Sequence, residues 1–178
     1  DEKYTLQVYQ ILKGLMDGNI KENKIVNHNR ERILSLIEDE ITKGHDGRII
    51  FKCNNICDEE IIQKLYDAAD AGVNINIIAR TVCTIHECPN LSVMSVCGRY
   101  LEHDRIYQFG NRVFISSSDI MSRNLDHRIE SFVELPGYFA HCLTKDLLEQ
   151  YINLDSRQNG SIVVWDMKDD SWIKRNIV

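Results

Sequence analysis

Apolar residues in the first quarter of the chain recur at the three- and four-residue spacing that is typical of amphipathic helices. One such segment covers residues 4–17. A second begins at Asn29, a residue type favoured at helix N-caps, and stops at Gly44. Its apolar stripe is formed by Ile33, Leu34, Ile37 and Ile41. The pattern therefore predicts two helices ahead of the first strand.

The next segments predict a strand, a helix and a second strand in succession. The strands are the apolar runs 48–53 and 74–79, and the helix between them covers residues 58–71. Asp58 is a candidate cap for this helix, and Gly72 follows its last turn. A helix that connects two strands of one sheet favours parallel pairing and a right-handed crossover. We therefore expect a βαβ unit here.

The second half of the chain is dominated by short strands. A tight turn at Gly110-Asn111 connects two of them, and the predicted strands are residues 93–97, 105–109, 112–116 and 129–133. A helix at 139–154 and a terminal hairpin of residues 161–167 and 171–175 follow. No linker rich in Pro, Gly or Ser divides the chain. We therefore predict an α/β fold, a single domain over residues 1–178 with a mixed sheet flanked by helices.

The composition is typical of a globular protein, with 43% hydrophobic and 27% charged residues. No apolar run approaches the roughly 18 residues of a membrane-spanning helix, and the first residues are too acidic for a signal peptide. The six cysteines are expected to be reduced, because nothing indicates export. We expect a cytoplasmic protein, with peripheral membrane association left open. The missing initiator Met favours a piece of a longer chain.

Charge is unevenly distributed along the chain. The net charge of −6 argues against nonspecific nucleic-acid binding. Within residues 99–128, however, five arginines and four acids leave the segment at +1, and these arginines are Arg99, Arg105, Arg112, Arg123 and Arg128. The guanidinium group suits bidentate contact with phosphate or carboxylate. Ordinary surface or ion-pairing arginines explain the same composition equally well.

Two groups of candidate residues stand at predicted strand ends, where open α/β sheets bind ligands. Arg80 directly follows the strand 74–79. His103 and Arg105 form an H-x-R arrangement at the start of another strand, and strand alternation points both side chains the same way. The pair combines a group able to transfer protons with one that neutralises phosphate charge. The alternatives are a helix-capping or ion-pairing Arg80 and a structural histidine.

A third group lies where the strand 112–116 ends. The serine run that includes Ser117 is followed by Arg123 and Arg128. Hydroxyl and backbone N–H groups suit phosphate oxygens, particularly where a helix starts at Asp119. Serine runs are also common in ordinary loops.

The segment C-T-I-H-E-C brings Cys83, His86 and Cys88 close together in sequence, all of them potential zinc ligands. Their spacing is not that of a zinc knuckle and no second pair follows, so no metal site is predicted. The chain also contains neither the phosphate-binding loop of P-loop kinases nor the G-x-S-x-G elbow of hydrolases.

Together these segments resemble the C-terminal domain of polyphosphate kinase, the enzyme family that builds inorganic polyphosphate from ATP. The match runs from about residue 29 to residue 152 and is carried by R-Y-L-E-H-x-R-I-Y-x-F-G-N and I-S-S-S-D-I-M-S-R-N. The resemblance implies a phospholipase-D-like fold, one of two such domains that share a site. It further implies that the histidine phosphorylated by ATP lies on the preceding domain. His103 then corresponds to the assisting histidine and Arg80 to the arginine that binds nucleotide phosphates.

The resemblance also implies ATP, ADP and inorganic polyphosphate as ligands, Mg²⁺ on the preceding domain, and a homo-oligomer of the full-length protein. The implied catalytic residue is His103, and the phosphate-binding set is Arg80, His103, Arg105, Ser117, Arg123 and Arg128. The chain departs from the family in three places. The loop from Arg80 to His103 is shorter, His127 stands where Arg is common, and Asp119 stands where phospholipase D has Asn.

Two other functions stay open. One is a phospholipase-D-like phosphodiesterase or nuclease that dimerises to bring two copies of His103 together. The other is a non-catalytic polyanion-binding module. A polyphosphate kinase domain is expected to be inactive without its preceding domain, whereas a phosphodiesterase would hydrolyse diesters in a His103-dependent manner.

Overall fold

The computed structural model describes residues 29–97 and 101–148, together with the strands β7 (Val163–Lys168) and β8 (Ser171–Asn176). Three isolated positions, which are Tyr9, Lys13 and Met16, are also described. The helix predicted at residues 4–17 otherwise lies outside the described residues. The described helices include none long and apolar enough to cross a membrane.

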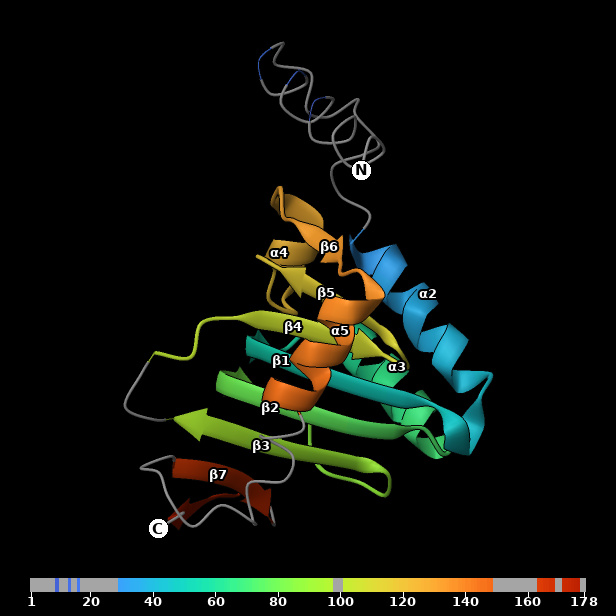
Figure 1. Cartoon of the computed structure of the whole chain (residues 1–178). Helices are drawn as coiled ribbons and strands as arrows, with labels where there is room; N and C mark the ends of the chain where they lie inside the picture. The colour runs from blue at the N-terminus through green and yellow to red at the C-terminus, as the bar shows by residue number, and fades with distance from the viewer. Residues whose placement is uncertain are drawn as a thin grey trace.

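The described residues form one mixed sheet of eight strands (Figure 1). Besides β7 and β8, its strands are β1 (Arg48–Ile56), β2 (Asn74–Cys83), β3 (Leu91–Cys97), β4 (Arg105–Phe109), β5 (Arg112–Ser116) and β6 (Phe132–Glu134). Their order across the sheet is β6-β5-β4-β1-β2-β3-β7-β8. The central strands β1, β2 and β3 are parallel, and all other neighbours are antiparallel. The predicted α/β class with a mixed sheet is confirmed.

The predicted βαβ unit is also confirmed, because helix α3 (Glu59–Asp70) connects the parallel strands β1 and β2. The carboxylate of Asp58 caps this helix by accepting a hydrogen bond from the Ile61 amide at 3.2 Å. Both strands continue past the apolar runs that predicted them. The parallel pairing continues beyond a register shift between Cys53 and Asn55. The ends of the two strands therefore include polar residues.

Helix α2 (Asn29–Ile41) precedes the sheet. Asn29 is the first described residue of the helix rather than a cap outside it, and its Nδ2 has no hydrogen-bond partner among the described residues. The apolar stripe is shifted from the prediction, since Leu36 is buried and Leu34 is only half-buried. The apolar side of α2 nevertheless faces the sheet, and the helix also packs against α3.

The second half of the chain begins with the hairpin β4–β5, whose turn contains Gly110 at a φ of +55°. Helix α4 (Ser122–His127) follows β5. Strand β6 is shorter than the predicted strand 129–133, because the residues just before it bind the end of β5 instead. Helix α5 (Gly137–Leu143) continues as a π-helical turn (Thr144–Leu148), and the rest of the predicted helix 139–154 lies outside the described residues.

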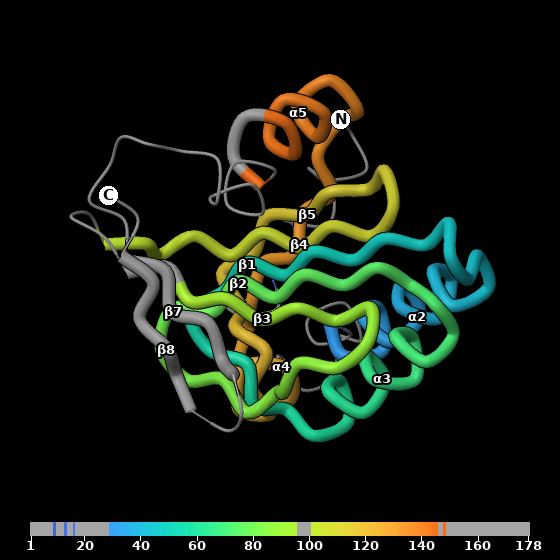
Figure 2. Tube along the Cα trace, turned by 90° about the horizontal axis from the view of Figure 1, so that it is seen from below, coloured from blue at the N-terminus to red at the C-terminus, as the bar shows by residue number. Residues whose placement is uncertain are grey.

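Helices cover both faces of the sheet (Figure 2). The larger core lies under α2, α3 and α4, and its aromatic residues are Phe51, Tyr107, Phe109, Phe114 and Phe132. A smaller core lies under α5 and contains Ile50, Ile78, Ile106, Val113, Ala140 and Leu148. Successive side chains of a strand alternate between the two faces of the sheet. Membership of one core or the other therefore shows which face a strand residue occupies. The charged residues near the strand ends can therefore be placed by the same alternation.

Candidate functional site

Four of the six predicted site residues lie along one edge of the sheet, and these are Arg80, His103, Arg105 and Ser117. Strands β1 and β2 are parallel and β4 runs opposite to β1, so the carboxyl ends of β1 and β2 lie beside the amino end of β4. Strand β5 pairs with β4 and ends at the same edge, with Ser116 opposite Arg105. We call this the carboxyl edge; it comprises residues 52–56, 80–83, 102–105 and 116–119.

His103 lies at the carboxyl edge in the exposed loop that precedes β4. Its Nδ1 is 3.1 Å from Nη1 of Arg105, which also donates a hydrogen bond to the His103 carbonyl oxygen at 2.7 Å. The two side chains therefore point together, as strand alternation predicts. Because an arginine nitrogen only donates, Nδ1 is the acceptor, which leaves the other ring nitrogen to carry the proton in the neutral imidazole.

The rest of the Arg105 guanidinium binds Asp119. Nε and Nη2 donate to the two carboxylate oxygens at 3.2 and 3.1 Å, and the arginine side chain is only 14% exposed. Burial raises the pKa of Asp119, but hydrogen bonds from Arg105, from the Asn55 side chain and from the Asn54 and Asn55 amides outweigh it and lower the pKa below its usual value. Helix α4 starts at Ser122, so a helix beginning at Asp119 is not observed.

A buried lysine supports the loop of His103 from the other side. Lys52 in β1 is 3% exposed, and its Nζ lies 2.7 Å from Asp104 Oδ1 and 3.0 Å from Glu102 Oε2. These two acids flank His103 in sequence, so their side chains are held on the opposite side of the strand from the imidazole. Sequence reasoning missed all three residues, although a lysine within the apolar run 48–53 was a usable signal.

Arg80 is half-buried in β2 at the carboxyl edge. Its carbonyl oxygen accepts a hydrogen bond from Ser95 Oγ, but its Nη1 is buried without a partner among the described residues. No carboxylate of the described part of the chain forms an ion pair with it. An ion pair of Arg80 is therefore not observed among the described residues. The neighbouring Asn54 is 1% exposed, and neither atom of its amide has a partner among the described residues.

The third predicted group consists of Ser117, Arg123 and Arg128, and two of these residues contact the segment just before β6. The exposed Ser117 donates its hydroxyl hydrogen to Glu130 and accepts a hydrogen bond from the Ser131 amide at 2.9 Å. Arg128 Nη1 lies 3.7 Å from Glu130 Oε1 and is half exposed. Arg123 is exposed on α4 and makes no ion pair with any described residue. The serine run is thus tied to the segment before β6.

The residues described here include no group of three or more side chains suited to hold a metal ion. In the C-T-I-H-E-C segment, Cys83 Sγ contacts the Ile85 carbonyl and the His86 amide donates to the Tyr66 hydroxyl at 2.8 Å. Burial raises the pKa of the Cys83 thiol to about 11, which disfavours the thiolate that metal binding requires.

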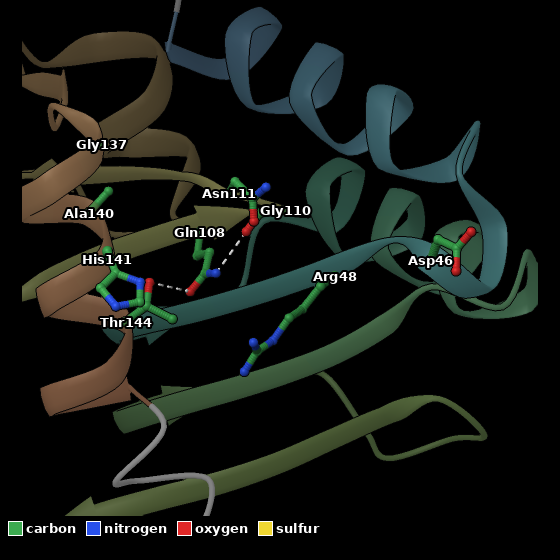
Figure 3. Close-up of a pocket in the computed structure, with 9 residues that line it drawn as sticks. All are labelled: Asp46, Arg48, Gln108, Gly110, Asn111, Gly137, Ala140, His141 and Thr144. Atoms are coloured by element: carbon green, nitrogen blue, oxygen red, sulfur yellow. Dashed lines mark hydrogen bonds between the residues drawn. The ribbon is translucent and has the colours of Figure 1, made fainter.

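A cavity of about 590 Å³ lies at the other end of the sheet (Figure 3). It is bounded by the start of β1, the β4–β5 turn and α5, and its lining includes Arg48, Gln108 and His141. Thr144 donates to Gln108 Oε1 at 3.1 Å, and Gln108 Nε2 donates to the Gly110 carbonyl at 2.7 Å. None of the predicted site residues lines this cavity.

Comparisons with known proteins agree on one family. The family model of the polyphosphate kinase C-terminal domain 2 matches residues 5–170. A polyphosphate kinase of Parasynechococcus marenigrum is 38% identical over 159 residues, which is 82% of this chain and 22% of that protein. Polyphosphate kinase 1 of Chlorobaculum tepidum is 43% identical over 114 residues, or 57% of this chain and 16% of that protein. The chain therefore spans less than a quarter of these relatives.

Solved structures show the same likeness. The crystal structure of polyphosphate kinase from Porphyromonas gingivalis superposes with a TM-score of 0.79 and 30% identity, over 96% of this chain and 28% of that one. NucT from Helicobacter pylori superposes with a TM-score of 0.58 and 12% identity, over 70% of this chain and 90% of that one. A phospholipase D family member, Nuc from Salmonella typhimurium, gives 0.55 and 14%, over 69% and 86%. These last two show that the fold is phospholipase-D-like, as predicted.

Proposed function

Since this chain belongs to the polyphosphate kinase C-terminal domain family, we propose that it forms one side of a phosphoryl-transfer site that binds the phosphates of ATP and inorganic polyphosphate. The other side belongs to the preceding domain of the longer enzyme. The longer enzyme transfers the terminal phosphate of ATP to polyphosphate. The site of this chain is the carboxyl edge, with Arg80 and His103 as its principal residues.

The observation that carries the proposal concerns the guanidinium of Arg80, and in particular its Nη1. Its Nη1 is buried without a hydrogen-bond partner among the described residues, whereas Arg30, Arg105 and Arg112 are all engaged by carboxylates. A buried unpaired donor costs free energy unless a ligand completes it. Phosphate oxygens match the fork of an arginine and take its charge-assisted hydrogen bonds. Arg80 therefore has the donor and the charge that phosphate binding requires.

His103 is proposed to assist the transfer. The histidine of the preceding domain attacks the terminal phosphorus of ATP, so a nitrogen–phosphorus bond forms while the bond to the ADP oxygen breaks. A terminal oxygen of polyphosphate then takes the phosphoryl group and restores the histidine. His103 donates a proton or hydrogen bond to the departing phosphate oxygen. Arg105 holds the imidazole through Nδ1, which directs the other ring nitrogen at the substrate.

The remaining predicted ligands are proposed to have smaller roles. Arg123 is exposed and makes no ion pair among the described residues, so it suits an outer contact with a long polyanion. Ser117 and Arg128 already contact Glu130, and a phosphate would have to compete with that carboxylate. We assign Mg²⁺ to the preceding domain. Its charge would neutralise the phosphates between the two halves of the site.

Isothermal titration of the 178-residue chain with tripolyphosphate and with ATP tests this proposal. Wild type is compared with Arg80→Ala and with Arg112→Ala, a control arginine that is paired with Glu134 away from the carboxyl edge. We expect salt-sensitive binding that weakens about 10- to 100-fold in Arg80→Ala and is unchanged in Arg112→Ala. Equal binding by all three proteins would refute the assignment of Arg80.

Catalysis is tested separately in a longer chain that includes the preceding domain. We expect His103→Ala to lower the rate of polyphosphate synthesis while the affinity for ATP changes little, because the imidazole acts on the leaving oxygen. The 178-residue chain alone is expected to form no acid-labile phosphohistidine. Rapid phosphohistidine formation by that chain would contradict the shared site.

A further inference from the structure

Asn54 is a second buried polar group at the carboxyl edge whose hydrogen bonds are incomplete. The residue is 1% exposed, and both Oδ1 and Nδ2 lack a partner among the described residues. Because both amide atoms are unpartnered, exchanging them in the side chain leaves the finding unchanged. Buried side-chain amides are nearly always hydrogen-bonded, so an amide with neither atom satisfied requires an explanation.

The backbone of Asn54 is, by contrast, firmly held. Its amide donates to Asp119 Oδ1 at 2.9 Å, and its carbonyl oxygen accepts from Thr81 Oγ1 at 3.0 Å. These contacts lie on the two sides of β1, one toward the end of β5 and one toward β2. The side chain is therefore fixed in position by its backbone rather than by contacts of its own.

Asn54 and Arg80 follow paired residues on two neighbouring strands. Cys53 and Ala79 are partners across the β1–β2 ladder, and both lie in the core under α2 and α3. The next residue along each strand turns to the opposite face. Asn54 and Arg80 are those next residues, at the point where the ladder shifts register, so the buried amide of Asn54 and the half-buried guanidinium of Arg80 lie on neighbouring strands at the carboxyl edge.

Arg80 brings a positive charge to this pair. Asn54 itself is neutral, and Lys52 on the same strand pairs with both Glu102 and Asp104, which leaves one excess negative charge on those three residues. Asp119 is occupied by Arg105. Among the described residues, Arg80 is therefore a cation at these strand ends without an ion-pair partner, and the amide of Asn54 adds a hydrogen-bond donor beside it without changing the net charge.

We propose that Asn54 is a second phosphate-binding residue, whose Nδ2 donates a hydrogen bond to the phosphoryl group that Arg80 binds. The inference rests on the proposed function and adds a residue that the sequence did not indicate. Oδ1 accepts from a water or a protonated phosphate oxygen in the same complex. The ligand is a phosphoryl group of either a nucleotide or a polyphosphate, and the two sources are separated by titration.

The test compares three substitutions by calorimetry, each with tripolyphosphate and with ATP. Asn54→Leu removes the amide while keeping similar volume, and Arg80→Ala serves as the reference. Asn76→Leu is the matched control, because Asn76 is a buried asparagine of β2 whose amide is satisfied by Asn74 and Ser92. Thermal unfolding of each protein is measured alongside.

We expect Asn54→Leu to weaken binding about tenfold for whichever ligand uses the site, and to leave the melting temperature equal to or above that of wild type. Asn76→Leu should lower the melting temperature and leave binding unchanged, because it breaks satisfied hydrogen bonds. Binding by Asn54→Leu equal to wild type, with Arg80→Ala weakened, would overturn the inference and leave the proposed function intact. No binding by wild type would overturn both.

A measurement on the unmodified protein covers the case in which Asn54→Leu fails to fold. In wild-type protein labelled with ¹⁵N, the side-chain NH₂ resonances of Asn54 should shift on titration with tripolyphosphate, and those of Asn76 should not. The two Asn54 protons should also exchange more slowly with water once the phosphate is bound. Unchanged Asn54 resonances at saturation would overturn the inference without any substitution.

Discussion

Lys52 Nζ lies 2.7 Å from Asp104 Oδ1, and this contact joins strand β1 to the exposed loop that carries His103 and leads into β4. The lysine is 3% exposed, and Asp104 and Glu102 compensate the charge of its buried ammonium group. The acids on either side of His103 are thereby drawn to one face. The imidazole is left on the other, beside Arg105. A residue of β1 thus sets the orientation of a histidine that precedes β4.

Replacing this lysine tests the relationship. Lys52→Met is expected to lower the free energy of unfolding by about 2 kcal/mol, less than for a fully buried pair because the two acids are partly exposed. The imidazole proton resonances of His103 should move as well, because the loop loses its anchor. Chemical denaturation and NMR measure the two effects.

Lys64→Met provides the control for this prediction, since Lys64 pairs with the exposed Glu38 on the helical surface. Its effect on stability should stay below about 1 kcal/mol, with no change at His103. A loss of stability in Lys52→Met with unchanged His103 resonances would show that the lysine only stabilises the sheet.

Asp119 makes the stability of the carboxyl edge dependent on pH. Its pKa in the folded protein is lowered below the value of about 3.9 that an unfolded aspartate has, so the carboxylate stabilises the fold above that pH. The stabilisation is lost as the pH falls through the lowered folded pKa. We expect the difference in stability between wild type and Asp119→Asn to shrink steadily below about pH 4. Urea denaturation at several pH values measures this difference.

The pKa of Asp58 is also lowered: burial raises it, but hydrogen bonds from Arg30, Ser122 and the Ile61 amide outweigh that effect. Asp58→Asn should therefore repeat the same pH trend independently of the carboxyl edge. A difference that grows on acidification for either variant would contradict the direction assigned to its carboxyl group.

Much of the fold follows from local patterns in the sequence. The apolar run 48–53 and the cap at Asp58 predicted the βαβ unit, because burial and capping act over a few residues. The predicted strand 129–133 has the wrong bounds, because a contact between residues distant in sequence decides where the strand begins. Its apolar character favours a strand, but Ser131 pairs with the serine run, and only Phe132–Glu134 joins the sheet.

The candidate site was predicted less completely than the fold. Alternation in a strand correctly placed His103 beside Arg105. The supports of these residues, however, are tertiary contacts. Lys52 meets Asp104 from 52 residues away, and Arg105 meets Asp119 across the β4–β5 hairpin. Neither spacing follows from a periodic pattern, so the engagement of Arg105 by a carboxylate could not be read from the sequence.

Arg30 joins three elements on the helical face. It forms hydrogen bonds of 2.6 to 2.8 Å with Asp58, Glu60 and Asp126, and its side chain is 17% exposed. We expect Arg30→Met to lower the free energy of unfolding by about 3 kcal/mol, because Asp58 is left buried without its partner. Thermal and chemical denaturation measure the loss.

The comparison for Arg30 is Arg112→Met. Arg112 also makes a bidentate pair, with Glu134 at 2.8 and 2.9 Å, but its side chain is 47% exposed. Solvent screening should therefore limit the loss of unfolding free energy in Arg112→Met to about 1 kcal/mol or less. Equal losses for the two variants would mean that burial does not determine the strength of these pairs.

Gly47 and Gly137 differ in the space available for a side chain, although neither has a positive φ. A Cβ on Gly47 would lie 2.6 Å from the Glu40 carbonyl oxygen and 3.0 Å from Val73 Cγ2. The end of α2 and the start of β1 would therefore have to move apart. At Gly137, the first residue of α5, nothing lies within 4 Å.

We therefore expect Gly47→Ala to lower the free energy of unfolding by about 2 kcal/mol, because the clash is with backbone that cannot rotate away. Gly137→Ala should raise it by about 0.5 kcal/mol, since alanine favours the helix and restricts the unfolded chain. Chemical denaturation of both variants checks the opposite signs. A destabilised Gly137→Ala would indicate that residues outside the described part of the chain pack against α5, because the described residues leave that position open.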